Sequence, residues 1–366
     1  MEGSPRILIV RLSAIGDVIH GLPVLCALRD ALPEAYLGWV VEGRAGDLLE
    51  CHPALDALVR VPRGWWKSPR EVWRLRRQLR AMRFDTVIDL QCLTKSAVAA
   101  WLSGARRRIG KAGADGRELS RWFHTELVAA GGEHVIEHYL ELLRPLGIGC
   151  QVSGFRCQVS ATERPDSTQT PPLVRFDLPE LLPDARMAED YLRRSRLAVG
   201  QFAILNPGAG WPSKIWPAER YGELARRLAR THDLPSVAVW GVADELPLAE
   251  AIFSASRGAA RLAPATSMRE LAALCRRSAL FVGSDTGPMH LAVAVGTPTI
   301  SLHGPSRAEW CGAYGQQNIR LQARYEAGSA LERRKADDSA MRAIEVELVA
   351  DACGLILGRS ASRQCG

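Results

Sequence analysis

The sequence has few of the features that mark secreted, membrane-spanning or disulfide-rich proteins. Its 366 residues include nine cysteines, but these are scattered, odd in number and never paired as CxxC, which is typical of reduced cytosolic thiols. No stretch approaches the roughly 18 apolar residues of a membrane span, and no charged leader precedes a long apolar segment at the start. We therefore expect a soluble, cytoplasmic protein.

Several binding motifs are also missing. The loop after the first apolar run holds only Gly16 and Gly21, so it lacks the GxGxxG spacing of NAD- and FAD-binding units. No GxxxxGK[ST] phosphate loop occurs, and the loops discussed below contain no Asp-x-Asp metal motif. RNP, KH and helix-turn-helix signatures are absent as well. These absences argue against a dinucleotide cofactor, a required divalent ion and a nucleic-acid partner.

Positive charge is abundant in one segment. The formal net charge is +7 and the isoelectric point is near 9.1. Between Arg60 and Arg83, nine lysines or arginines stand against the single acid Glu71, with three tryptophans among them. The stretch "PREVWRLRRQLRAM" at 69–82 predicts a basic helix that would suit anionic lipid or a phosphorylated glycolipid. A solvated helix face explains the same pattern, and the sequence leaves both interpretations open.

The chain repeats one pattern twice. Short apolar runs such as "RILIVRL" and "FDTVIDLQ", and later "FAILNPG" and "ALFVGSD", alternate with helical periodicity, which predicts βαβ units around parallel sheets. We expect an N-terminal α/β domain at 1–160, a linker rich in Pro, Ser and Thr at 161–185, and a second α/β domain at 186–345. A helix at 346–366 follows, and packing back on the first domain is one option for it.

The loop after the first strand contains a candidate catalytic carboxylate. Ligands of doubly wound domains bind beside the carboxyl ends of the strands, so chemistry is expected in the loops that follow strands. In "RLSAIGDVIHGLP", Asp17 lies where a helix begins. Asp17 would act either as a helix N-cap or as a general base that faces the cleft, and spacing alone favours the cap.

Two loops of the second domain are candidate phosphate sites. In "LNPGAGWPSKIWP", Ser213 and Lys214 precede a helix start, where a lysine can bind phosphate as a point charge, although an incidental surface lysine fits too. In "GSDTGPMH", Asp285 or Thr286 would cap a helix whose first N–H groups, at Thr286 and Gly287, form an anion site. Asp285 is awkward beside phosphate, so we expect it to cap the helix or to contact a hydroxyl or a positive charge near the ligand.

A weaker signal follows another strand of the second domain. In "WGVADELPLAE", Asp244 or Glu245 would hold a ribose diol, unless the carboxylate only starts a helix.

Together, these loops resemble the lipopolysaccharide heptosyltransferases, family 9 of the glycosyltransferases. The resemblance runs from Arg6 to about Leu357 and rests on "RILIVRLSAIGDVIHGLPVL", "LNPGAGWPSKIWP" and "GSDTGPMHLAVAVGTPTISLHGPS", with "QCLTKSAVAAWL" between them. It implies the GT-B architecture, in which two facing Rossmann-like doubly wound domains enclose an interdomain cleft. The segment 320–340 departs from the pattern because it lacks the cysteines that many relatives carry there.

The resemblance also implies roles for single residues. It makes Asp17 the catalytic base, which reverses the preference for a cap, and Lys214 the ligand of the donor's diphosphate together with Thr286 and Gly287. The other donor-site residues that it implies are Ser213, Asp285, His290 and, for the ribose, Glu245. "QCLTKS" looks more like the heptosyltransferase I branch, which implies that Lys95 and, less directly, Arg60 contact the acceptor.

The function implied by the resemblance is inverting transfer of L-glycero-D-manno-heptose from ADP-heptose to the Kdo region of lipid A. A cytoplasmic enzyme with peripheral contact to the inner membrane, no required cofactor and no nucleic-acid partner is expected. Alternatives that the sequence leaves open are another GT-B transferase, for example heptosyltransferase II, and a sugar-nucleotide epimerase. A basic nucleic-acid-binding protein is the remaining alternative, and none of its signatures is present.

Overall fold

A computed structural model describes residues 4–112, 118–149 and 174–364. The chain divides into two compact units, Met1–Asp177 and Leu178–Gly366. The division falls inside the expected linker at 161–185, most of which lies outside the described residues.

The first unit is a six-stranded sheet in the order β3-β2-β1-β4-β5-β6, with every pair of neighbouring strands parallel. Strands buried on both faces read as continuous apolar runs, which explains sequences such as "RILIV" and "TVID". The elements are β1 (Arg6–Val10), α1 (Ile15–Ala31), β2 (Tyr36–Glu42), η1 (Gly43–Leu49), β3 (Ala57–Val61), η2 (Trp65–Lys67), α2 (Pro69–Ala81), β4 (Thr86–Asp89), α3 (Thr94–Ser103), β5 (Arg107–Lys111), η3 (Glu118–Phe123), β6 (Glu126–Val128), α4 (Val135–Glu141) and η4 (Arg144–Leu146).

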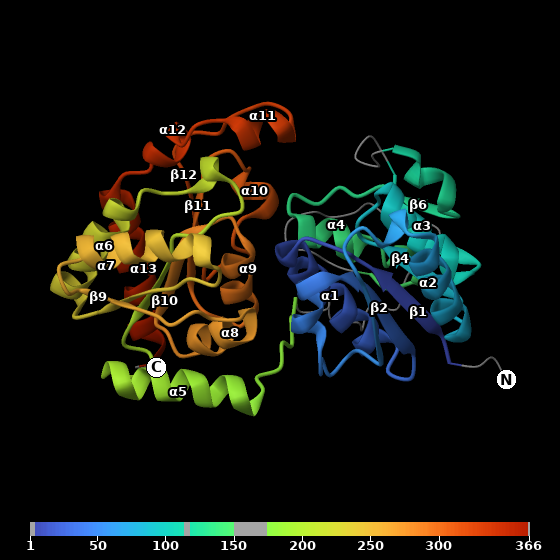
Figure 1. Cartoon of the computed structure of the whole chain (residues 1–366), viewed down its shortest axis with the longest axis horizontal. Helices are drawn as coiled ribbons and strands as arrows, with labels where there is room; N and C mark the ends of the chain where they lie inside the picture. The colour runs from blue at the N-terminus through green and yellow to red at the C-terminus, as the bar shows by residue number, and fades with distance from the viewer. Residues whose placement is uncertain (1–3, 113–117, 150–173, 365–366) are drawn as a thin grey trace. The chain divides into compact units, whose positions relative to one another are not determined.

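Helices cover both faces of this sheet. The helices α1 and α4 pack together on one face, and α2 and α3 pack together on the other (Figure 1). Leu75 and Leu79 of α2 join a buried cluster with Ala99 and Ala100 of α3 and with the strands beneath. The expected helix at 69–82 is therefore α2, and it buries only a narrow apolar stripe.

The second unit repeats the arrangement. Its sheet has the order β12-β11-β10-β7-β8-β9, again parallel throughout. The elements are α5 (Leu182–Ser195), β7 (Ala203–Asn206), η5 (Pro212–Lys214), α6 (Ala218–His232), β8 (Ser236–Ala238), η6 (Ala243–Glu245), α7 (Leu246–Ala255), β9 (Ala260–Leu262), α8 (Met268–Arg276), β10 (Leu280–Ser284), α9 (Gly287–Ala294), β11 (Thr299–His303), α10 (Ala308–Cys311), β12 (Ile319–Gln322), α11 (Ala330–Lys335), α12 (Ser339–Arg342) and α13 (Val346–Gln364).

The last helix belongs to the core of the second unit. Val349, Cys353 and Ile356 of α13 are buried in one cluster with α6 and the strands β10 and β11. Packing across the first domain, the option left open by the sequence for 346–366, is therefore not what the apolar face of this helix does. The reason is that this face packs against α6, β10 and β11 of its own unit.

Both sheets share one topology. Counted along the chain within each unit, the strand order is 3-2-1-4-5-6, so both units are doubly wound and Rossmann-like, as the sequence predicted. The first and fourth strands of each unit are neighbours, and from them the chain adds strands toward opposite sides of the sheet. These strands are β1 and β4 in the first unit and β7 and β10 in the second. Loops that leave the carboxyl ends of these four strands are therefore the expected binding loops.

Among the described residues, no helix is both long and apolar enough to cross a lipid bilayer.

Candidate functional sites at the two switch points

Asp17 follows β1 but does not cap α1. The N-cap is Ala14, and Asp17 is the third residue of the helix. Its Oδ2 accepts a hydrogen bond of 3.0 Å from the backbone N–H of Ala14, so the carboxylate bonds back to the cap from inside the first turn. The interpretation of Asp17 as the N-cap is thus wrong by one turn. Its side chain keeps 40% of its surface exposed, which leaves it accessible to a substrate.

Arg11 fixes the orientation of Asp17, and it is not among the residues predicted from the sequence. The Nη2 of Arg11 lies 2.6 Å from Oδ2 of Asp17, and its Nη1 donates to the carbonyl of Leu90. Burial alone would lower the pKa of Arg11, but Tyr139 and Asp17 raise the pKa above its usual value. A permanently charged guanidinium therefore stands behind the carboxylate. An arginine that directly follows a buried apolar strand is the signal that could have identified it.

Lys95 lies at the same switch point, in the first turn of α3. Its Nζ is 3.0 Å from Oε2 of Glu42 at the end of β2 and 3.3 Å from Oγ of Ser13 in the loop that leads to Asp17. Lys95 thus connects the ends of three strands. Arg60 is placed differently, because its guanidinium is held by Asp47 and Glu50 of the η1 region.

A buried network holds the loop that carries Lys95. Oδ1 of Asp89 accepts from the N–H groups of Gln91 and Cys92, and Oδ2 accepts from Ser96 Oγ and lies 3.1 Å from Nε2 of His124. Gln91 extends the network to the first loop, because its Oε1 accepts from the N–H of Leu12. His124 was missed by sequence reasoning, since 35 residues separate it from Asp89.

Lys214 and Asp285 form the centre of the second switch point. The Nζ of Lys214 donates to Oδ2 of Asp285 at 2.6 Å and to its carbonyl at 3.2 Å, and the ammonium lies over the ring of Trp211. Nε2 of His290 lies 3.1 Å from the other carboxylate oxygen. Burial favours the neutral acid, but His290 and Lys214 hold the pKa of Asp285 well below its usual value. Asp285 is therefore an ionised carboxylate that pairs with Lys214 and His290. This agrees with its expected contact with a positive charge.

The turn after Asp285 starts α9. Thr286 is the N-cap, one of the two candidates from the sequence, and Gly287 and Pro288 are the first two helical residues. The Oγ1 of Thr286 donates to the carbonyl of Ser284, so the side chain does not occupy the N–H groups of the first turn. These N–H groups carry the partial positive charge of a helix N-terminus and can bind an anion.

Two further predicted donor residues have internal partners. Ser213 is buried and donates to the carbonyl of Arg333, so α11, in the segment 320–340 of unassigned role, covers the lysine loop. Glu245 accepts from the N–H of Gly241 at 2.8 Å and stands directly against Gly208. A Cβ added to Gly208 would lie 2.4 Å from Oε1 of Glu245. The glycine thus lets the carboxylate lie beside the lysine loop.

Within the described part of the chain, two groups of three side chains have the composition of a metal site: Asp89 with Cys92 and His124, and Asp285 with His303 and Cys311. In the first, all four hydrogen bonds described above already satisfy the Asp89 carboxylate. In the second, the Lys214 ammonium lies 2.6 Å from Oδ2 of Asp285, and it would repel a cation. Neither arrangement favours a metal ion over the hydrogen bonds present.

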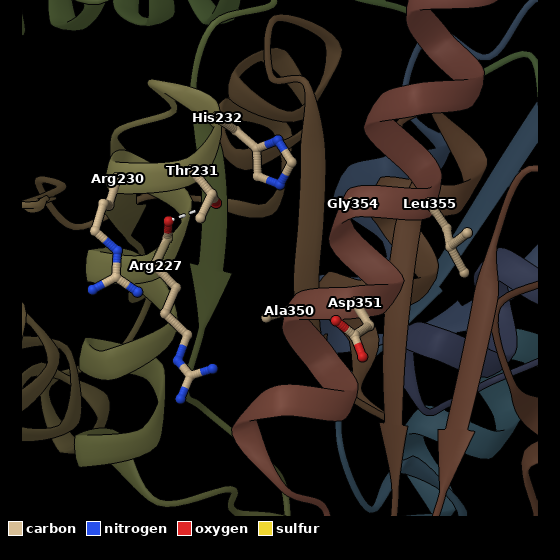
Figure 2. A pocket seen from close by; sticks show the side chains of 8 residues that line it. All are labelled: Arg227, Arg230, Thr231, His232, Ala350, Asp351, Gly354 and Leu355. Carbon is tan, nitrogen blue, oxygen red and sulfur yellow. Dashed lines mark hydrogen bonds between the residues drawn. The ribbon is translucent and has the colours of Figure 1, made fainter.

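A surface groove of about 540 Å³ lies elsewhere on the second unit, between the end of α6 and α13 (Figure 2). It is lined by polar side chains that include Arg230, His232 and Asp351. Because α6 begins beside Lys214 and runs back antiparallel to the strands, its last residues lie at the opposite edge of the sheet. This groove is therefore distinct from the switch-point loops.

The fold and the two switch-point sites define a class of protein. Doubly wound units bind ligands such as nucleotides at their switch points, where this chain has a supported carboxylate in one unit and a lysine beside a helix N-terminus in the other. Residues 72–340 match the model of glycosyltransferase family 9 (heptosyltransferase), and the chain belongs to this family. It is a glycosyltransferase, as the resemblance implied.

Individual relatives agree with this assignment. The chain is 31% identical to lipopolysaccharide heptosyltransferase 1 of Pseudomonas aeruginosa, over 90% of this chain and 86% of that protein. It is 26% identical to the protein of the same name from Escherichia coli K12, over 86% of this chain and 92% of the relative. The expected likeness to the heptosyltransferase I branch is thereby confirmed.

Solved structures show the same fold. The glycosyltransferase family 9 protein of Veillonella parvula superposes with a TM-score of 0.79 at 22% identity, covering 98% of this chain and 99% of that one. E. coli heptosyltransferase WaaC with ADP-2-deoxy-2-fluoro heptose gives 0.70 at 23% identity, covering 94% and 98%. The expected GT-B class of two Rossmann-like domains is confirmed.

Proposed function

We propose that this glycosyltransferase moves L-glycero-D-manno-heptose from ADP-heptose to the Kdo region of lipid A, in synthesis of the lipopolysaccharide inner core. The observation that carries the proposal is the second switch point. There Lys214 lies next to the first turn of α9, whose N-cap residue makes no side-chain hydrogen bond to the N–H groups of that turn. The name of the P. aeruginosa relative and the ADP-heptose analogue in the E. coli structure support the choice of donor and pathway.

The donor's diphosphate would bind to Lys214 and to the first N–H groups of α9. An ammonium has three N–H donors, and Asp285 receives two of those of Lys214, which leaves one for a phosphate oxygen. The ammonium of Lys214 is paired with Asp285. An arriving diphosphate would compete with this carboxylate for the ammonium, and the ion pair would then lengthen. Glu245 would accept hydrogen bonds from the ribose, because its Oε1 faces the loop at Gly208. Ser213 would act through its backbone and by fixing the loop, since its hydroxyl is already bonded.

Asp17 would be the general base. Both of its hydrogen bonds from the described residues go to Oδ2, which leaves Oδ1 to accept the proton of the acceptor hydroxyl. The deprotonating oxygen would attack the anomeric carbon while the bond from that carbon to the diphosphate breaks. ADP leaves with the electron pair, its charge stabilised by Lys214 and α9. This single displacement inverts the anomeric configuration, and a metal ion has no necessary step in it.

The acceptor would bind at the first switch point. The Nζ of Lys95 contacts Oγ of Ser13, and the next residue, Ala14, donates its N–H to Asp17, so the ammonium would contact the acidic Kdo sugar near the base. Arg60 would contact a more distant phosphate, for which it must leave its two acidic partners. The proposed location is the cytoplasm, with peripheral contact to the inner membrane because the acceptor is a lipid.

A donor and acceptor panel tests the proposal. Purified protein is incubated with ADP-heptose, UDP-sugars or GDP-sugars and with either Kdo-lipid A or the same lipid already carrying one heptose, and products are identified by mass. We expect transfer only from ADP-heptose and only to Kdo-lipid A. Transfer only to the acceptor that already carries heptose would assign the chain to the second step instead, and conversion of a nucleotide sugar without acceptor would indicate an epimerase.

A further inference from the structure

One face of the first unit gathers the exposed tryptophans of the protein. The chain has ten tryptophans, all within the described residues, and six of them are buried or half-buried. The remaining four expose half of their surface or more: Trp66 (50%), Trp73 (58%), Trp101 (52%) and Trp122 (80%). All four lie within residues 66–122, although the second unit contains four of the ten. We call these four residues the tryptophan face.

The four residues lie on elements that pack against one another in series. Trp66 belongs to η2, which contacts α2, and α2 with Trp73 packs beside α3 with Trp101 (Figure 1). The helix α3 in turn contacts η3, which holds Trp122, and the ring of Trp101 lies 6.4 Å from that of Phe123. The tryptophan face therefore covers the outer side of one helical layer.

Positive charge lies around Trp66 and Trp73. The helix α2 turns Leu75 and Leu79 inward, so its opposite side, centred on Trp73, faces solvent. At 100° per residue, four arginines lie within about 60° of Trp73 around the helix axis. The guanidinium of Arg77 lies 5.2 Å from the centroid of Trp73, and the ammonium of Lys67 lies 5.2 Å from that of Trp66. The four arginines are Arg70, Arg76, Arg77 and Arg80.

Acidic residues are nearly absent from this helix. Glu71 is its single acid, and it lies on the flank of α2, where its side chain is mostly covered and 3.7 Å from Arg74. A helix face that only needs to be soluble would mix charges of both signs and would gain nothing from exposed indoles. Indole rings among arginines are instead the combination that settles at the headgroup level of an anionic bilayer.

We propose that the tryptophan face and the outer arginines of α2 dock the protein on an anionic lipid bilayer. The positive charge of α2 is complementary to an anionic bilayer, and the four indole rings would insert between its headgroups. The choice of a lipid surface rests on the proposed function, in which the acceptor is a membrane lipid. Since α2 begins at the edge of the sheet where β3 ends, docking would bring the loops of Asp17 and Lys95, at that same edge, close to the headgroups.

Vesicle binding by the full-length protein tests the proposal without any sugar substrate. Cosedimentation is measured with vesicles of phosphatidylcholine alone and of phosphatidylcholine with phosphatidylglycerol, at two salt concentrations. We expect at least tenfold tighter binding to the anionic vesicles, weakened by salt, with a blue shift of tryptophan fluorescence. The variants W66A/W73A and R70Q/R77Q should each lose at least tenfold in binding. The control F253A/R257Q removes an exposed aromatic and an exposed arginine from the second unit and should bind like the wild type.

Three results would overturn the proposal. The first is equal binding to neutral and anionic vesicles, or none. The second is tighter binding to RNA or DNA than to anionic vesicles at the same salt, lost in the same variants. The third is an equal loss of heptose transfer by W66A/W73A on bilayer-bound and on deacylated, water-soluble acceptor, because a docking face affects only the first. Failure of the wild type to transfer heptose to either acceptor would refute the proposed function and leave the vesicle result standing.

Discussion

The two units of the protein have one topology and opposite electrostatics at corresponding positions. In the first unit, the loop after the first strand carries a carboxylate, Asp17, and a lysine, Lys95, follows the fourth strand. In the second unit the order is reversed, because Lys214 follows the first strand and Asp285 the fourth. The same topology therefore places opposite charges at corresponding loops, which is what the proposed base and the proposed phosphate site require.

The supporting contacts differ in the same sense. Asp17 is partly exposed and its cationic partner Arg11 is buried behind it, so the carboxylate is the group offered to a ligand. In the second unit Lys214 and Asp285 are both largely buried, and the carboxylate of Asp285 offsets the charge of the lysine. A partly exposed carboxylate suits the proposed removal of a proton, whereas a lysine held by a carboxylate until an anion competes for it suits the proposed binding of diphosphate.

Replacement of Asp17 by Asn should have the largest effect. Loss of a positioned general base costs roughly 10² to 10⁴ in rate, and we expect kcat to fall at least 10³-fold with little change in the KM for ADP-heptose. Arg11 is buried and would lose its charged partner, although the Asn oxygen can still accept a hydrogen bond from it, so the free energy of unfolding should fall by about 1 to 3 kcal/mol. Steady-state kinetics and denaturant unfolding measure both quantities.

The matched control is E34Q, which removes an exposed carboxylate from the first unit. It should retain wild-type kcat. Turnover of D17N within tenfold of the wild type, in folded protein, would show that Asp17 is not the base.

Replacement of Lys214 by Ala should come next in magnitude, and it should act on the donor. One lost donor to developing negative charge costs about 10² to 10³. We expect kcat/KM for ADP-heptose to fall by that factor and ADP binding by calorimetry to weaken, with the KM for the acceptor unchanged. The substitution leaves Asp285 buried without its cation, so D285N/K214A, which removes both charges, should recover stability but no activity. Unchanged ADP affinity in K214A would refute the phosphate assignment.

The sequence predicted the fold and the loops that follow the strands well, because both depend on local patterns. Continuous apolar runs identified the buried parallel strands, and Gly, Pro and a nearby helix start identified the loops of Lys214 and Thr286. The sequence placed Asp17 at the start of a helix but at the wrong position of the first turn. That position depends on where the helix begins, and the N-cap is Ala14.

Contacts between distant segments could not be predicted. His124 against Asp89 and Arg333 over Ser213 each join residues that only the folded chain brings together. The packing of α13 was left undecided for the same reason. The direct partner of Lys214 is Asp285, 71 residues away, so the sequence offered both groups without showing that they bind each other.

Acid stability should distinguish the units through their buried histidines. Burial lowers the pKa of His303 in the second unit to about 4, whereas an unfolded chain binds the proton near pH 6.5. As the pH falls from 6.5 to 4, His303 is protonated in the unfolded state but not in the folded state. The free energy of unfolding therefore falls by about 1.4 kcal/mol per pH unit. This stabilisation is complete above pH 6.5. We expect H303N to remove this slope, about 3 kcal/mol in all, from denaturant unfolding curves measured across that range.

His52 provides the comparison in the first unit. Burial lowers its pKa as well, but a hydrogen bond to the carbonyl of Phe176 opposes the change. H52N should therefore remove a smaller slope than H303N. Equal slopes in the two variants would show that burial does not set the acid sensitivity of the second unit.

Two glycine substitutions should give the smallest effects and separate a binding position from a packing position. A Cβ on Gly208 would meet the flexible end of Glu245 at 2.4 Å, so G208A should displace that carboxylate, raise the KM for ADP-heptose several-fold and leave the unfolding midpoint nearly unchanged. A Cβ on Gly21 in the first unit would meet the buried ring of Trp39 at 2.8 Å, so G21A should cost about 1 to 3 kcal/mol of stability with an unchanged KM in the folded fraction. E245Q should reproduce the G208A kinetics, because both substitutions act on the proposed ribose contact. If G208A raises the KM and E245Q does not, the glycine contacts the donor itself and Glu245 serves only to hold the N–H of Gly241.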